Sequence, residues 1–251
     1  MAIDYNKRPS TPPAAPVAPT AAAPSAPAAA AVPAAPGGGK VSLTKGAPRV
    51  SLTKSGAVGG VARVNLNWSA TPPAPAQPAS GGFLAKMKNA AAAAAGAKGV
   101  DLDLGCLYEL ADGRKGVIQA LGNSFGSLNS PPWIALDGDD RTGSVAGGEN
   151  MSINLGQPGR FKRVLIFAMI YEGAANWAAV DGVVTLTPAS GQQFEVKLDA
   201  TGSGSRMCAV AQLVESGGEL VFQREVQYIE GGQMALDKAY GWGMEWARGR
   251  K

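Results

Sequence analysis

The sequence predicts an all-β protein: an antiparallel β-sandwich with a disordered Pro/Ala-rich N-terminal tail and a short helical insertion. The first observation is a series of short apolar segments, spaced by roughly ten residues and separated by Gly-rich turns, as in sandwich domains. The second is that nine of the eighteen prolines fall within the first 40 residues. The third is a second Pro/Ala-rich stretch at 69–82, followed by an Ala-rich run with strong helix formers at 83–98.

Alternation of apolar and polar residues marks the strands. A short repeat, VSLTKG (41–46) and VSLTKS (50–55), alternates Val and Leu with Ser and Thr, and VARVNLNW (61–68) continues the pattern. The segment 161–171 is so uniformly apolar that we expect it in the centre of a sheet. The other predicted strands are 100–110, 115–121, 151–155, 182–188, 192–199, 206–215 and 219–229.

Turn residues join these strands. Asp112-Gly113 is a hairpin signal, and Gly-containing turns predict two more hairpins, 182–188 with 192–199 and 206–215 with 219–229. We expect residues 122–135 to form an ordered loop anchored by Trp133. The chain closes with a segment whose Met234, Trp242 and Trp246 are expected to cap the sandwich as a short helix or extended stretch.

The domain organisation follows from composition. Residues 1–40 cannot bury enough apolar surface to offset their ordering entropy, so we expect a disordered tail of polyproline II character. Residues 41–251 form one β-sandwich domain with a flexible insertion at 69–98. The tail is a spacer or a ligand for a proline-reading domain, and the helix at 83–98 is exposed or touches an anionic surface.

Charge and composition exclude several functions. Residues 1–100 carry a net charge of +9 and residues 101–251 a net −5, so a basic arm precedes an acidic domain. The absence of histidine excludes Ser-His-Asp and Cys-His catalysis within this chain. Cys106 and Cys208 lie in apolar strands, and we expect buried reduced thiols; a disulfide or a metal pair is the alternative. Without an apolar run of about 18 residues or a secretory signal, we expect a cytoplasmic protein.

The chemistry-bearing residues are carboxylates. Asp101 and Asp103, two apart on a predicted strand, point to the same face, and the Gly-rich loop Leu136–Asn150 concentrates further oxygen ligands. Such a set is typical of a hard cation, above all calcium, whereas zinc and copper favour His and Cys. Magnesium fits the same donors, and simple Asp turns would explain the loop without a metal. The candidate metal ligands are Asp101, Asp103, Asp137, Asp139, Asp140, Thr142, Gly143, Glu149 and Asn150.

Other motifs indicate little. The loop is not an EF-hand, because Arg141 occupies the fifth position counted from Asp137. The sequence has no P-loop and no GxGxxG after a strand. Paired acids could serve a hydrolase, but no matching nucleophile accompanies them, so we expect a protein that is not an enzyme.

The set of motifs VSLTKG, VARVNLNW, VDLDLGCLYEL, GDDRTG, GGEN and MSINL resembles the bacterial tellurium-resistance TerD family, particularly its TerA-like members. The resemblance covers roughly 41–246 without the insertion. It implies a calcium-binding β-sandwich associated with tellurite resistance and wider stress responses, whose molecular activity is not well defined. It matches Asp101, Asp103, Asp139 and Glu149 to the family's acidic calcium ligands, with Asp137 and Asp140 as neighbours. The family's second acidic cluster carries three consecutive acids, whereas GGEN offers only Glu149 beside Asn150, which implies one ion or weak affinity.

From these observations we expect a calcium-binding, non-enzymatic stress-response protein that acts as an interaction module. Its expected partners are other stress-response or TerD-family proteins, with peripheral association to a membrane and no nucleic acid. The alternative is a metal-free scaffold, or a protein that binds its partners through the tail.

Overall fold

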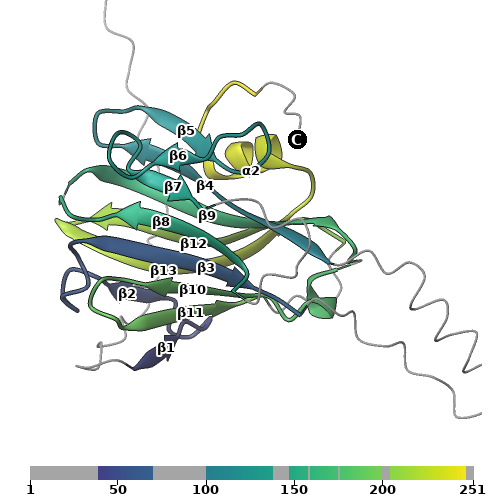
Figure 1. Cartoon of the computed structure of the whole chain (residues 1–251), viewed down its shortest axis with the longest axis horizontal. Helices are drawn as coiled ribbons and strands as arrows, with labels where there is room; N and C mark the ends of the chain where they lie inside the picture. Colours follow the sequence, from purple (N-terminus) through teal and green to yellow (C-terminus); the bar gives the residue numbers. More distant parts are fainter. Residues whose placement is uncertain are drawn as a thin grey trace, which may run out of the picture.

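The computed structural model describes residues 39–69, 100–137, 147–157, 159–174, 176–198 and 204–246. The predictions of a disordered tail at 1–40 and of a helix at 83–98 lie outside the described residues, apart from Gly39 and Lys40. Two β-sheets face each other (Figure 1), as the sequence predicts. Among the described residues, no helix is long and apolar enough to cross a membrane.

The first sheet has seven strands, in the order β1-β11-β10-β3-β8-β7-β6. Their bounds are β1 Lys40–Ser42, β11 Gln193–Lys197, β10 Val183–Thr187, β3 Val61–Asn67, β8 Glu149–Asn154, β7 Ile134–Leu136 and β6 Gly126–Ser127. The second sheet has six strands, in the order β2-β13-β12-β9-β4-β5. Their bounds are β2 Arg49–Ser51, β13 Glu219–Ile229, β12 Met207–Ser216, β9 Phe161–Glu172, β4 Asp101–Leu110 and β5 Lys115–Ile118.

Alternation places the core between the sheets. In β3 the buried side chains are Ala62, Val64 and Leu66, while their neighbours face outward. The strand β9 lies inside the six-stranded sheet and is buried on both faces, which explains its continuous apolar sequence. The predicted central position of 161–171 and the three predicted hairpins, β4–β5, β10–β11 and β12–β13, are therefore confirmed.

The two copies of the VSLTK repeat belong to different sheets. β1 pairs with β11, in the one parallel pairing among the described strands, whereas β2 pairs antiparallel with β13. Each copy contributes the last two residues of a three-residue strand before the chain turns. The segment 39–57 thus contributes one edge strand to each sheet and connects the two sheets along one side of the sandwich.

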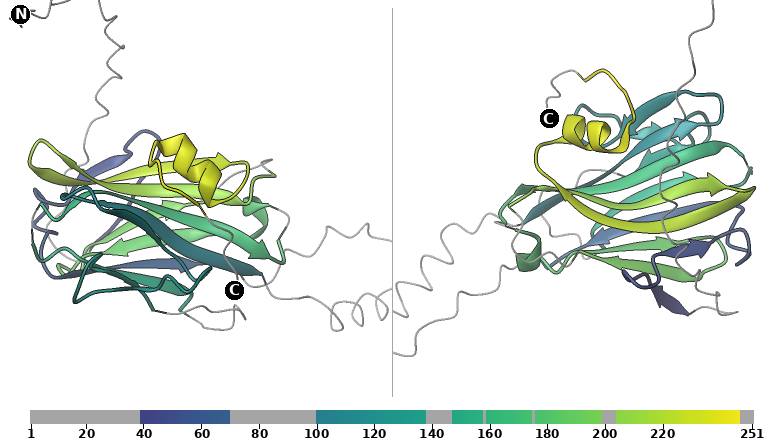
Figure 2. Two further views of the ribbon diagram at one scale, coloured as in Figure 1. Left: turned by 90° about the horizontal axis from the view of Figure 1, so that it is seen from above. Right: turned by 180° about the vertical axis from the view of Figure 1, so that it is seen from behind.

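The outer face of the six-stranded sheet is covered by the helix α2, Gln233–Tyr240, and the segment after it (Figure 2). A second apolar cluster lies beneath, made of Leu107, Leu165, Phe167, Met207, Ala209, Leu236 and Trp242. Trp242 is fully buried, which confirms its predicted role. The prediction for Met234 is wrong, because its side chain is 68% exposed on the solvent side of the helix.

The segment 122–135 is more regular than expected. It contains β6 and the start of β7, and its cis peptide bond joins Pro131 to Pro132. Trp133 is half-buried and packs against the core, with the Arg160 guanidinium 4.2 Å above its ring. The predicted role of Trp133 as an anchor is confirmed.

Candidate functional site

Asp101 and Asp103 lie at the start of β4, and their side chains are 6% and 3% exposed. β5 pairs only with Cys106–Glu109, so among the described strands the first half of β4 has β9 as its one strand partner. The register against β9 shifts between Asp101 and Leu102. The sequence therefore places both buried carboxylates on a stretch of β4 that has an open strand edge.

Glu149 reaches this edge from the other sheet. It begins β8, is 3% exposed, and its Oε2 accepts a hydrogen bond from the Leu104 amide at 2.5 Å. Leu104 follows Asp103, so the Glu149 carboxylate lies against the stretch of β4 that carries the Asp pair. Burying several carboxylates together is opposed by mutual repulsion and by loss of hydration, and a bound cation relieves both costs.

The flanks of the carboxylate loop also lie beside Glu149. Asp137 follows β7 and its amide donates to the Asn150 carbonyl at 2.9 Å, so the chain leaves and re-enters next to the start of β8. The Asp137 side chain is exposed. Asp139, Asp140, Thr142 and Gly143 lie outside the described residues.

Gly148 shows why this loop needs glycine. Its φ is +64°, and a β-carbon there would run into the carbonyl oxygen of Leu66 in β3. Only glycine combines the left-handed backbone with so close an approach. The backbone of 148 is thereby held against β3, which positions Glu149 one residue later.

The side chain of Asn150 lies on the opposite face of β8 from that of Glu149. Successive strand residues face opposite sides, so Asn150 points away from the core while Glu149 points inward. Its Oδ1 accepts from the Arg63 Nε at 2.9 Å and from the Asn65 Nδ2 at 2.8 Å. The structure therefore does not bring the Asn150 amide to the buried carboxylates. The sequence signal was available: a strand drawn from 149 instead of 151 would have placed the two residues on opposite faces.

The two cysteines are buried where their thiols cannot react. Cys106 and Cys208 are both fully buried, no disulfide joins them, and they lie on β4 and β12, on either side of β9. Burial raises the pKa of the Cys106 thiol far above its ordinary value, since the thiolate would lose its hydration. The prediction of buried reduced thiols is confirmed.

Within the described ranges, His, Cys, Asp and Glu side chains form no group of three or more with the arrangement of a metal site. The described part of the site therefore consists of a buried Asp pair and one carboxylate that crosses between the sheets. Its donors are oxygens, which suit a hard cation.

The chain is similar to a tellurium resistance protein. It is 41% identical over 212 residues to the tellurium resistance protein TerA of an Alcaligenes species, across 84% of this chain and 58% of that protein. The chain belongs to the same family as that TerA protein. This TerA-like membership confirms the resemblance carried by the motifs. The TerA-like chain spans 58% of the length of this curated relative, and no protein-family model matches it.

Two solved structures are similar to the TerA-like chain. One is SAV2460, a protein of unknown function: 20% identity, TM-score 0.44, 68% of this chain and 91% of that chain. The other is SCO6318 from Streptomyces coelicolor A3(2), described as a homologue of the telluride resistance protein TerD. It shares 19% identity over 70% of this chain and 93% of that chain, with a TM-score of 0.43.

Proposed function

We propose that this TerA-like chain is a calcium-binding, non-enzymatic interaction module of a tellurite-resistance or related stress response. The observation that supports it is the contact between Glu149 and the Leu104 amide, which brings a buried carboxylate of one sheet to the residue that follows Asp103 in the other. The relative named for tellurium resistance supports the cellular role.

The donors fit calcium better than the alternatives. Asp101, Asp103 and Glu149 offer carboxylate oxygens, the chain has no histidine, and Cys106 faces the core. Calcium accepts six to eight oxygen ligands in flexible geometry, including backbone carbonyls and water. We propose that residues from the loop between Asp137 and Gly147, including Asp139 and Asp140, complete the set.

A cation at this position would link β4 to β8, and so one sheet to the other. Because it would bind the folded chain and not the unfolded one, its first effect would be on stability, about 2.7 kcal/mol at a hundredfold excess over its dissociation constant. A loop ordered in this way would then present a surface to partners. We propose other stress-response or TerD-family proteins as those partners, with peripheral association to a membrane.

The experiment is calcium titration of the full chain by calorimetry, together with thermal unfolding in calcium and in EDTA. The double variant Asp103→Asn/Glu149→Gln keeps the volume and hydrogen-bonding capacity of the site but removes its charge. Asp112→Asn is the matched control, because Asp112 is an exposed acid paired with Arg114. We expect heat and stabilisation in the wild type and in the control, and neither in the double variant. No calcium effect in the wild type rejects the proposal.

The alternative is a metal-free scaffold or a protein that binds through its tail. It is favoured by the described residues, which form no complete metal-ligand group among themselves. In that case partner capture would survive chelation and would be lost on deletion of 1–40 or 83–98. Capture experiments with both deletions, with and without EDTA, separate the two functions.

A further inference from the structure

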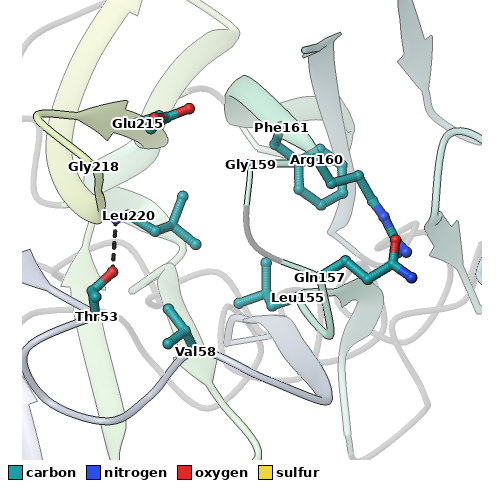
Figure 3. A pocket seen from close by; sticks show the side chains of 10 residues that line it. All are labelled: Thr53, Val58, Leu155, Gln157, Gly159, Arg160, Phe161, Glu215, Gly218 and Leu220. Carbon is teal, nitrogen blue, oxygen red and sulfur yellow. Dashed lines mark hydrogen bonds between the residues drawn. The ribbon is translucent and has the colours of Figure 1, made fainter. Parts of the chain in front are cut away.

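A hollow lies at the opposite end of the sandwich from the carboxylates. Asp101 pairs with Glu172 at one end of β9, whereas the hollow opens at the other end, beside Phe161. Its volume is about 110 Å³. It is bounded by the end of β8, the start of β9 and the turn between β12 and β13 (Figure 3).

The walls of the hollow are apolar. Leu155 and Phe161 are 4% and 5% exposed and belong to the main core, and the half-buried Val58 and Leu220 lie opposite them. Figure 3 shows the side chains of Val58, Leu155 and Leu220 directed into the space. The hollow is therefore an opening into the core between the two sheets, the kind of place where small ligands bury hydrocarbon.

Its rim carries one charge of each sign. The side chains of Arg160 and Glu215 lie on opposite sides of the hollow (Figure 3). An anionic head group would be attracted to the first and repelled by the second. The rim thus fixes a direction for an amphipathic ligand as well as its position.

Arg160 is available to such a head group. Its guanidinium lies over the Trp133 ring, and its Nη1 makes one long hydrogen bond, 3.4 Å, to the Asn154 carbonyl. Its Nε is buried and has no hydrogen-bond acceptor among the described residues. The nearby carboxylate of Asp112 is already committed to Arg114, at 2.6 Å from its Nη2. Within the described ranges, Arg160 makes no ion pair.

Arg160 also stands between two hollows. The second, about 290 Å³, is a shallow surface hollow that Trp133 helps to line. Gln157, Gly159 and Arg160 line both. Hydrocarbon in the first hollow and a head group at the border would therefore occupy adjoining spaces, the second of which is open to solvent.

We propose that this opening binds a short aliphatic carboxylate, with its hydrocarbon among Val58, Leu155 and Leu220 and its carboxylate on Arg160. A cavity of about 150 Å³ holds a benzene molecule, so the space here suits a chain of roughly four or five carbons. Guanidinium is the cation that recognises carboxylate best, because its N–H groups match the two oxygens.

The test uses the full chain and three probes: pentanoate, pentylamine and acetate. Pentylamine keeps the hydrocarbon and reverses the charge, whereas acetate keeps the charge and removes the hydrocarbon. Binding is measured by calorimetry and by chemical-shift changes in NMR spectra. We expect pentanoate to bind in the millimolar range or tighter, and pentylamine and acetate to bind at least tenfold more weakly.

Three variants complete the test. Arg160→Gln should weaken pentanoate at least tenfold, whereas Arg114→Gln, at an exposed arginine paired with Asp112, should leave it unchanged. Val58→Phe, which fills the hollow from a half-buried position, should abolish binding while the protein stays folded by circular dichroism. If Val58→Phe does not fold, the comparison of the two arginine variants still decides. The proposal is overturned if pentanoate does not bind, if pentylamine binds equally well, or if Arg160→Gln binds like the wild type.

Discussion

The Glu149 carboxylate accepts a hydrogen bond of 2.5 Å from the Leu104 amide, and this contact joins the two sheets at the open edge of β4. The bond is local in space but spans 45 residues of sequence. It fixes where the β7–β8 loop meets the strand that carries Asp101 and Asp103. The stability of this end of the sandwich should therefore depend on it even without calcium.

Glu149→Ala should destabilise the fold in EDTA by about 1–3 kcal/mol, because the buried Leu104 amide loses its acceptor. Glu149→Gln keeps a carbonyl oxygen in the same place and should recover most of that loss. Urea unfolding of the two variants measures the difference. Equal stability of both variants and the wild type would show that the contact contributes nothing.

Gly148→Ala should lower the free energy of unfolding by more than about 1 kcal/mol. Alanine is strained in the left-handed conformation, and its β-carbon would also collide with the Leu66 carbonyl. Gly113→Ala is the matched control, since Gly113 has a φ of +86° but open space around it. The excess loss in Gly148→Ala isolates the close approach of the loop to β3. Identical losses, measured by urea unfolding, would contradict it.

Arg163 holds the C-terminal cover, by which we mean the helix α2 and the segment after it, residues 233–246. Its guanidinium lies 3.8 Å above the Trp242 ring and donates to the carbonyls of Tyr240 and Gly241 and to the Glu109 carboxylate. Arg163→Met should cost about 2–3 kcal/mol, since Glu109 is 4% exposed and would lose its ion pair with Arg163 while keeping the one with Lys162. Limited proteolysis should then cleave first near α2. Lys54→Met, which breaks an exposed ion pair with Glu219, should leave the cleavage pattern unchanged.

Acid should loosen the same cover before it unfolds the sandwich. Desolvation raises the pKa of Glu109, but hydrogen bonds from Lys162 and Arg163 outweigh it and hold the pKa below its ordinary 4.5. The pKa of Asp237 is likewise held below 3.8: desolvation opposes this, and bonds from the Met244 amide, the Trp246 indole and the Gly243 amide prevail.

A carboxyl whose pKa is depressed on folding contributes stability above its unfolded pKa and loses it as the pH falls. Tryptophan fluorescence should therefore report movement of Trp242 and Trp246 as the pH drops below about 5. The variants Trp242→Phe and Trp246→Phe assign the signal. A fluorescence change that coincides with global unfolding by far-UV circular dichroism would contradict an early loosening of the cover.

Neither thiol should react in the native protein. Cys106 and Cys208 are fully buried, and burial raises the pKa of the Cys106 thiol, so an alkylating reagent at pH 8 meets neither access nor thiolate. Both should be labelled in urea, as counted by mass spectrometry. Rapid labelling of the folded protein would show that one of these strands opens.

Much of the fold could be predicted from the sequence, because strand alternation and turn chemistry are local. The hairpins β10–β11 and β12–β13 follow from period-two segments around glycine, and the position of β9 follows from its continuous apolar run. The two copies of VSLTK show the limit. Both were predicted as strands, but identical local patterns cannot say that one copy joins each sheet.

The carboxylate site could be predicted only in part. The place of Asp101 and Asp103 on one strand follows from the pattern, whereas their burial is seen only in the structure. The sequence pattern does not predict the orientation of Asn150 toward Arg63 and Asn65, because the strand it predicts begins at 151, two residues after the start of β8. Met234 is misplaced because a helix of only eight residues gives too few positions to define which side packs.

The sequence by itself determined the family, the strands and the turns, the buried thiols and the oxygen character of the candidate metal site. Each of these depends on residue type and on spacing along a few neighbouring positions. Only the tertiary structure decided that Glu149 reaches Leu104, that Arg163 holds the C-terminal cover, and that Arg160 stands at the border of an apolar opening. These relationships join residues far apart in the chain, and the packing of two sheets sets them.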